Sequence, residues 1–370
     1  MGSRRKVRGG AGWVVAATCM VAGPCAHAEV TLYGNLDVSV DNFRTSGAPS
    51  GNIKSTTAMT SNISDIGMRG SEDLGDGVKA IFQINGIVDV NSGSGSLVDG
   101  DSYVGLSSAS YGQLTLGRGH TPLMRSTVLL DPFGDGWYGA VAAYDNIIGS
   151  SQGLTGGGGY PWDVVQSNAI QYQTPTVYGA AGWLYVGFSN STTAKTVSVV
   201  SAAVNYLSNG LYLSYAFEQH NGWLLGEGVG FTTPATSSTD TDHRIGMGYR
   251  FGSNQLSAIV ERMSYEQNHN ESLNHWSMLL GYLRFVGPHV FRASYIKAWS
   301  ESGRPDSGAQ QFALGYGYNL SKRTQVYTAI SYLDNQKQAN YNPLSMILNG
   351  AYTPAGGRAV LYSVGIHHDF

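Results

Sequence analysis

The sequence predicts an all-β fold, a 16-stranded antiparallel transmembrane β-barrel over residues 29–370. Three observations support this prediction. Apolar and polar residues alternate along most segments, glycine and tyrosine are abundant at 50 and 23 of 370 residues, and only 13% of residues are charged. Strands that face lipid on one side and water on the other have this pattern of one apolar and one polar face with few charges.

The first 28 residues form a separate segment. They begin with the basic MGSRRKVR, continue through the short apolar run WVVAATCMVAG and end at AHA, which is an A-x-A cleavage site. The run is too short to cross a bilayer as a helix, and Pro24 before Cys25 disfavours a lipoprotein site. We therefore expect residues 1–28 to be a cleaved secretory signal peptide.

Cleavage would change the charge and the cysteine content of the chain. Four of the 22 basic residues and none of the 25 acidic ones lie in residues 1–28, so the mature chain would carry −7. Cys19 and Cys25 would also be removed, which leaves no disulfide to stabilise the exported chain. The negative charge argues against nucleic acid as a partner.

The alternation begins at the predicted mature start. In EVTLYGNLDVSVDN, Val30, Leu32 and Leu36 share one face, and Asn35 and Asp37 share the other. The same period occurs in GVKAIFQIN, GLYLSYAFE, RIGMGYRF and FALGYGYNL, and in YSVGIHHDF it reaches the final residue. About sixteen such strands fit the chain, as in a mid-sized membrane barrel. We interpret the ending as a last strand that pairs with the first, with Phe370 at the membrane interface.

Short and long connections alternate between these strands. DLGDG, SASYG, LSNG and FGSN are tight turns, whereas longer polar loops fall near residues 43–58, 87–100, 119–165, 219–241, 299–308 and 334–357. A soluble β-sandwich also shows period-2 alternation, but its turns need not sort into a short and a long set. The polar face here also carries small residues, including Gly246, Gly248 and Gly315. A closed barrel in lipid accounts for both faces.

Several segments also match a known family. EVTLYGNLDVSV, SDIGMRGSEDLGDGVKAIFQIN, DSYVGLSSASYGQLTLGR, NAIQYQTP and VGIHHDF occur in the order found in general porins of Gram-negative bacteria. Over residues 29–370 the chain resembles the trimeric, 16-stranded porins of the beta-proteobacterial and neisserial type. The resemblance implies a water-filled outer-membrane channel for passive diffusion of small hydrophilic solutes and ions, without enzymatic activity, metal or cofactor. It also implies a homotrimer surrounded by outer-membrane lipid, with Phe370 as the signal for the barrel-assembly machinery.

The resemblance further implies that the third long loop, about residues 119–165, folds inward and constricts the pore. Its LDPFGDGW segment, with Asp131 and Asp135, resembles an acidic segment that faces a basic wall in such pores. This chain departs from that pattern at four wall positions, where it has Asp65, Asn85, Asp101 and Gln171. Asp65 stands where an arginine is usual, Asp101 near where a basic residue is common, and Gln171 where Lys or Arg is common. The acid of the family's KAIFQLE is Asn85.

The basic residues left for the predicted wall are Arg69, Lys79 and Arg118, with Arg244, Arg250 and Arg292 elsewhere on the inward face. Rings of fixed charge at a narrow waist select solutes by sign. Because acidic and neutral residues replace bases here, we expect a pore that is only weakly anion-selective, or is cation-selective. Lys79 also fits a simple strand-end role beside the DLGDG turn.

Other functions stay open as alternatives on the same fold. A channel selective for one solute class would bind that solute saturably, and a structural or adhesive barrel would have a closed lumen. The glycine-rich GLTGGGGYP lacks the Lys-Ser/Thr of a phosphate loop. The scattered histidines, among them His275 and His367, lack metal-ligand spacing and are expected at the surface or at interfaces.

Overall fold

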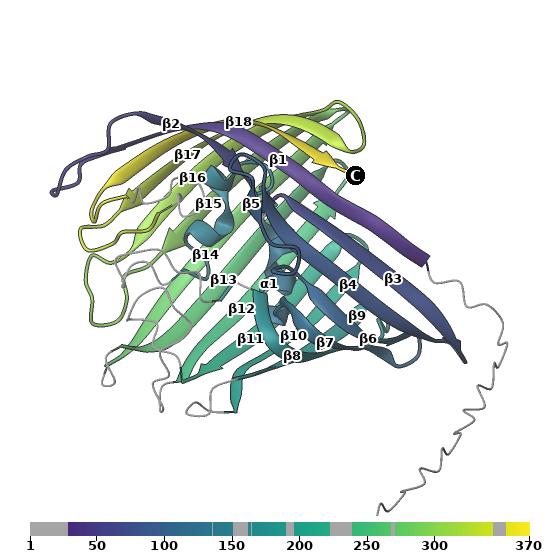
Figure 1. Cartoon of the computed structure of the whole chain (residues 1–370). Helices are drawn as coiled ribbons and strands as arrows, with labels where there is room; N and C mark the ends of the chain where they lie inside the picture. Colours follow the sequence, from purple (N-terminus) through teal and green to yellow (C-terminus); the bar gives the residue numbers. More distant parts are fainter. Residues whose placement is uncertain are drawn as a thin grey trace, which may run out of the picture.

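The barrel wall is one antiparallel sheet (Figure 1). The computed structural model describes residues 29–134, 136–150, 162–163, 165–189, 196–222, 239–267, 271–342 and 353–370. The sheet has 18 strands, of which β2 (Thr56–Ser61) and β5 (Ser94–Gly95) are short additions paired with β1 and β4. The other strands, sixteen in the described residues, form the wall.

The wall strands follow one another around the barrel in chain order. They are β1 Glu29–Ser46, β3 Asp65–Gly75, β4 Val78–Asp89, β6 Ser102–Ser108, β7 Gly112–His120, β8 Val165–Gln173, β9 Ala180–Phe188, β10 Val197–Ser208, β11 Leu211–Asn221, β12 Thr239–Phe251, β13 Asn254–Gln267, β14 Glu271–Val286, β15 His289–Ala298, β16 Ala309–Asn319, β17 Thr324–Asn335 and β18 Arg358–Asp369.

The sheet closes because the last strand pairs with the first, as the sequence predicts. β1 pairs with β18 from Asn35 to Ser46 and with β3 from Glu29 to Asn35. The Phe370 amide donates to the Gly34 carbonyl at 3.0 Å. The Phe370 ring covers Gly34 closely, since a Cβ on Gly34 would lie 2.8 Å from Phe370 Cζ. The C-terminal residue is therefore part of the closing seam.

The two faces of the wall differ as the alternation predicts. On β1, Val30 and Leu32 are 58% and 59% exposed, whereas Asn35, Asp37 and Ser39 on the opposite face are buried. Large apolar side chains are exposed in the same phase around the wall, among them Val104, Leu114, Leu184, Val204, Ile245, Leu256, Leu280, Leu314 and Val364. Within the described residues, no helix is long and apolar enough to cross a membrane. The apolar face is thus the outer, lipid-facing side of the barrel.

The short connections are tight hairpin turns. Asp76 and Gly77 have φ of 51° and 73°, and Asn209 and Gly210 have 51° and 81°. Two successive residues with positive φ form the mirror-image turn whose twist matches that of paired antiparallel strands. These turns lie at one edge of the barrel, and the long connections lie at the other.

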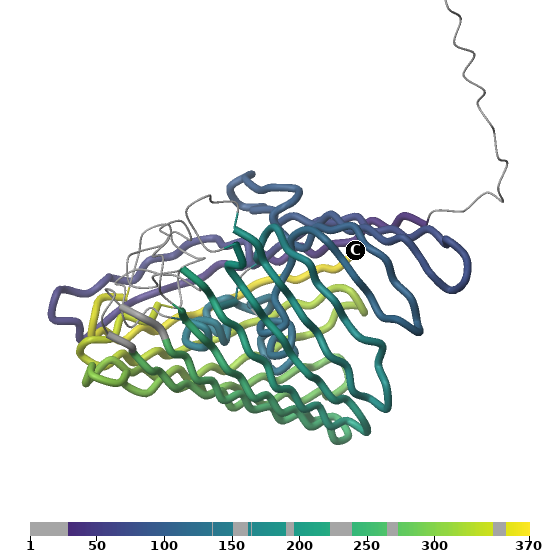
Figure 2. Tube along the Cα trace, turned by 90° about the horizontal axis from the view of Figure 1, so that it is seen from below, coloured from purple at the N-terminus to yellow at the C-terminus, as the bar shows by residue number. Residues whose placement is uncertain are grey.

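The described part of the β7–β8 connection lies inside the curve of the sheet (Figure 1 and Figure 2). It contains α1 (Pro122–Thr127) and 3-10 turns at Val128–Leu130, Ala140–Ala142 and Tyr144–Asn146. Its side chains contact inward-facing glycines: a Cβ on Gly246 would lie 2.5 Å from Leu130 Cδ1, and one on Gly315 would lie 2.7 Å from Phe133 Cε1. The small residues on the inward face therefore give the connection room against the wall.

Part of the inward face is apolar where this connection covers it. A buried cluster joins wall residues Ile259, Leu279, Ile296, Leu333 and Leu361 to connection residues Phe133, Val141, Ile147 and Ile148. These wall residues belong to β13, β14, β15, β17 and β18. The connection is thus held against that side of the barrel in part by apolar burial.

Candidate constriction site

A cavity of about 310 Å³ lies between the β7–β8 connection and the opposite wall. From the wall, Tyr33, Asp65, Gln83 and Asn85 line it, and from the connection Met124, Arg125, Val128 and Trp137. Asp101 and His120, at the wall's long-loop edge, complete it together with Ile63, Ile87 and Gly100. Three of the predicted site residues, Asp65, Asn85 and Asp101, therefore line one cavity.

Asp65 is held by neutral hydrogen-bond donors. Its carboxylate accepts from the Asn35 amide at 3.0 Å, from Asn35 Nδ2, and from Asn85 Nδ2 at 2.6 Å. Among the described residues, no cation forms an ion pair with it. These donors are neutral and do not cancel the charge of the carboxylate, so Asp65 places a negative charge at the cavity wall.

Asp101 forms a tether between the wall and the connection. Its carboxylate accepts from Arg125 Nη2 at 2.6 Å, from the His120 amide at 2.7 Å, and lies 3.0 Å from His120 Nδ1. Burial alone would raise the pKa of Asp101, but hydrogen bonding to His120 and the charges of His120 and Arg125 lower it well below its usual range. Asp101 is therefore an anion whose charge Arg125 offsets.

His120 and Arg125 were not predicted as site residues. His120 meets Asp101 where β6 and β7 pair, next to the Ser102–Arg118 pair. Nothing in the spacing of Arg125 indicates its contact with Asp101, because that contact joins a strand end to a loop helix. The one available signal is Thr121-Pro122, since proline at the first helical turn predicts a helix start. That start would place Arg125 one turn further on, but it does not indicate the direction of the side chain.

The predicted basic wall is dispersed. Arg69 lies on the inward face opposite Thr31, with its guanidinium 5.1 Å from the centre of the Tyr33 ring. Lys79 pairs across strands with Asp73 and Ser107, two residues after the Asp76–Gly77 turn. It lies six residues, or about 20 Å, along β4 from Asn85. Lys79 is thus at the barrel edge and away from the cavity.

The placement of Arg118 on the inward wall was wrong. On β7, Thr115 and Gly119 are buried, whereas Leu114 and Leu116 are exposed, and Arg118 shares the phase of the two leucines. Its guanidinium donates to the Asp99 carbonyl at 2.8 Å and to Ser167 Oγ at 2.6 Å. Period-2 alternation itself assigns this outward phase, because 114, 116 and 118 fall on one face.

Gln171 does lie on the inward face, opposite Thr115. In the connection, Asp131 is buried, and its carboxylate accepts from the Phe133 amide at 3.1 Å, which stabilises the turn. Asp135, the second predicted acid of this segment, lies outside the described residues. The roles of these residues in selectivity stay predictions.

Basic residues of the opposite wall hold the connection in place. Arg244, fully buried, forms a two-point ion pair with Asp163 at 2.6 and 2.7 Å and also bonds Glu261 at 2.8 Å and Asp242 at 3.1 Å. Glu261 in turn accepts from the Gly149 amide at 2.8 Å. Asp163 and Gly149 belong to the connection, so this cluster fixes it to β12 and β13.

A second anchor lies at Tyr138 of the connection. The Arg292 guanidinium lies 4.0 Å from the centre of the Tyr138 ring, and Arg292 Nε donates to the Pro132 carbonyl at 3.0 Å. The Tyr138 ring also lies 5.0 Å from the ring of His367. Arg292 is therefore covered by the connection.

Two histidines expected at the surface or interfaces are buried in the lumen. His367 lies 3.1 Å from Asp37 and from Asp369, and His275 contacts Tyr341 at 3.3 Å. The expectation failed because the alternation places both on the inward face, where the connection and loops cover them. Among the described residues, no group of three His, Cys, Asp or Glu side chains could hold a metal ion.

The pKa of Asp145, a buried acidic residue of the connection, is also shifted. Burial, followed by the negative charges of Asp163 and Asp131, raises the pKa of Asp145 to about 8. Asp145 is therefore protonated at neutral pH, which reduces the repulsion within the acidic cluster around Arg244.

Comparison with known proteins decides the family. The sequence model of the Gram-negative porins matches residues 14–338. The chain belongs to the Gram-negative porin family. This porin is 29% identical to outer membrane porin protein 32 of Delftia acidovorans, with 93% of this chain and 95% of that relative covered. It is 25% identical to the major outer membrane protein P.IB of Neisseria meningitidis, with 88% and 94% covered. The porin is thus an outer-membrane protein, as the sequence predicted.

Solved structures show the same fold. The anion-selective porin from Comamonas acidovorans matches this porin with a TM-score of 0.78 at 24% identity, covering 93% of this chain and 100% of that one. OmpT of Vibrio cholerae matches with 0.67 at 12% identity, covering 93% and 98%. At these identities the matches establish the barrel alone, and they confirm the predicted 16-stranded architecture.

Proposed function

We propose that this porin is a passive diffusion channel for small hydrophilic solutes and ions, narrowed where the β7–β8 connection faces β1, β3 and β4. The observation that carries the proposal is the cavity there, which has charged and carboxamide side chains on its wall. Its volume of about 310 Å³ suits small solutes. The inward position of the connection supports a constricting role.

We further propose that the pore prefers cations weakly. At the cavity, Asp65 has only neutral partners, whereas Arg125 and Asp101 offset each other. Arg244 is outnumbered by three carboxylates, and Arg292 is buried under Tyr138. Among the described residues that line this cavity, Asp65 is thus the carboxylate whose charge no ion-pair partner offsets, and it favours cations there.

The test is the reversal potential of the purified protein in a planar bilayer under a KCl gradient. We expect stepwise open currents and a cation preference. Asp65→Asn removes one charge about 5 Å from a passing ion, worth about 0.8 kcal/mol in water, so the cation-to-anion permeability ratio should fall about two- to fourfold. A strong anion preference in the unmodified protein would contradict the charge assignment, and an absence of open currents would favour a closed-lumen barrel.

The oligomeric state and membrane insertion of this porin are proposed from its membership of the porin family. We propose a homotrimer in outer-membrane lipid, inserted by the barrel-assembly machinery through the C-terminal Phe370. The exposed apolar face supports contact with lipid, and a trimer form of Vibrio cholerae OmpT shares the fold, with a TM-score of 0.65 at 13% identity. Currents that appear in steps of three would support the trimer.

A further inference from the structure

A group of three glutamines lies on the inward face of β7 and β8, next to the constriction. Gln113 and Gln173 are directly opposite each other, and Gln171 faces Thr115 one position along. We call Gln113, Gln171 and Gln173 the glutamine track. Directly opposite residues in antiparallel strands have Cβ atoms about 5 Å apart, so the three carboxamides form one continuous polar surface.

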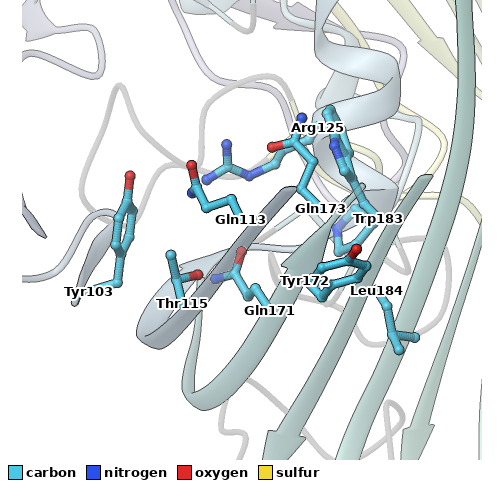
Figure 3. A pocket seen from close by; sticks show the side chains of 10 residues that line it. Tyr103, Gln113, Thr115, Arg125, Gln171, Tyr172, Gln173, Trp183 and Leu184 are labelled. Atoms are coloured by element: carbon cyan, nitrogen blue, oxygen red, sulfur yellow. The ribbon is translucent and has the colours of Figure 1, made fainter. Parts of the chain in front are cut away.

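Aromatic and polar groups complete the surface (Figure 3). Trp183 lies opposite Gln173 on β9, Tyr103 comes from β6, and Arg125 approaches from α1. The indole Nε1 of Trp183 is buried without a hydrogen-bond partner. No side-chain hydrogen bond of Gln171 or Gln173 occurs within the part of the chain that the structure describes. The carboxamides of Gln171 and Gln173 are available to a molecule that lies on the track.

The track adjoins the constriction. Arg125 lines both the 310 Å³ cavity and the recess at the glutamine track. Across β6, Tyr103 Oη donates to Gln83 Oε1 at 3.3 Å, and Gln83 lines the cavity. A solute that leaves the constriction toward the short-turn edge therefore passes along the glutamines.

The chemistry of the track favours neutral solutes with many hydroxyl groups. A carboxamide both donates and accepts hydrogen bonds, and so does a hydroxyl, so the two can pair in several orientations. The track itself carries no charge, and Arg125, the cation that lines its recess, is paired with Asp101. An ion would lose hydration there without gaining an opposite charge. The rings of Tyr103 and Trp183 offer apolar faces for the C–H faces of a sugar.

The size of the recess sets the binding mode. Its volume of about 60 Å³ holds a few water molecules and is too small to enclose a sugar ring. A sugar would therefore lie along the wall in the lumen, with hydroxyl groups in place of those waters. Such a site would be weak and would release its solute readily, as passage through a channel requires.

We propose that the glutamine track is a binding subsite for neutral polyhydroxylated solutes such as mono- and disaccharides. The inference rests on the proposed function, because it requires an open channel. It makes the pore more than a size filter: sugars are retained at the track for longer than neutral molecules of similar mass that cannot donate hydrogen bonds along their length.

The test is a titration of maltose into single open channels, with the fractional current block measured in KCl. Polyethylene glycol of about 300 Da serves as the neutral comparison, since its chain oxygens only accept hydrogen bonds. Maltose should block saturably and polyethylene glycol should not. The double variant Gln171→Met, Gln173→Met keeps the side-chain length and removes the carboxamides. At about fivefold per lost hydrogen bond, its half-blocking maltose concentration should rise roughly tenfold to thirtyfold.

The control is Gln255→Met, which removes a carboxamide in the lumen phase of β13 at the short-turn edge. Its half-blocking concentration should equal that of the unmodified protein. Open channels that maltose and polyethylene glycol block alike, or an equal shift in both variants, would overturn the subsite and leave the diffusion channel standing. An absence of current in the unmodified protein would instead overturn the proposed function.

Discussion

The clearest test of the constriction is Arg244→Ala. The Arg244 guanidinium is fully buried and makes bonds of 2.6 and 2.7 Å to Asp163, with further bonds to Glu261 and Asp242. Removing one partner of a buried ion pair costs about 3–5 kcal/mol, because the remaining charges stay buried without compensation. Asp163 belongs to the β7–β8 connection, so much of this cost weakens the attachment of the connection to the wall.

This free-energy cost can be converted into a change in the fraction of channels whose connection is detached from the wall. A loss of 3–5 kcal/mol raises the fraction of channels with a detached connection by roughly 10²- to 10⁴-fold. Single-channel recordings should therefore show larger open currents and more open-channel noise for Arg244→Ala. Arg244→Lys keeps the charge but loses the two-point geometry, and should give an intermediate result.

Arg250→Ala is the matched control on the same strand. Arg250 lies in the same inward phase of β12, but it is exposed and bonds only Gln255 at 3.1 Å among the described residues. Its removal should leave the open-channel noise unchanged. If Arg244→Ala and Arg250→Ala channels had the same current and noise, the Arg244 cluster would not hold the connection in place, and the reasoning would be refuted.

Three further outcomes follow from the described contacts. The raised pKa of Asp145 keeps its proton in the folded state up to about pH 8, so folding stability should fall as the pH rises from about 4 to about 8. Asp145→Asn should therefore raise the melting temperature at about pH 9 and leave it unchanged at about pH 4. Equal effects at both pH values would contradict the raised pKa. The lowered pKa of Asp101 means that the stability contributed by its contacts is lost only as the pH falls through that lowered value. The contact with Arg125 should therefore persist at about pH 4, and open-channel noise should be the same there as at neutral pH. Asp101→Asn, which removes the charge, should raise the noise at both pH values. Gly34→Val would place a Cβ 2.8 Å from Phe370 Cζ and closer still to the Asp65 carbonyl. The yield of folded barrel on refolding should therefore drop. Gly252→Asn, in an open turn with φ of 55°, should refold normally.

The fold could be predicted from the sequence because strand alternation is a local property. Val30 and Asn35 take opposite faces whatever lies further along the chain, and the unbroken pattern to Phe370 predicts closure. The same rule applied strictly would have assigned Arg118 outward. The resemblance to a basic wall took precedence over the phase at that one residue, and the result was an error.

The site could be predicted only in part, because its geometry depends on a loop. Asp65, Asn85 and Asp101 sit on or beside strands, and the structure places all three in the lining of one cavity, whereas their role in selectivity stays a prediction. Arg125 comes from the connection, and no period relates a loop residue to the strand that it contacts. The apolar inward residues, such as Ile259 and Leu333, had no local explanation either, since it is the connection that covers them.

The effect of lumen charges on ion selectivity can be inferred only when the partners of each charge are known. Arg244 and Arg292 face inward, and counted alone they would favour anions. Both are instead buried against the connection, where they anchor Asp163 and Tyr138. The basic residues of that wall thus hold the connection in place, and under the proposed function the solute meets Asp65 on the opposite wall. Constriction and ion preference therefore depend on the same contacts: a change that detaches the connection widens the pore and also uncovers arginine, so pore size and selectivity should change together.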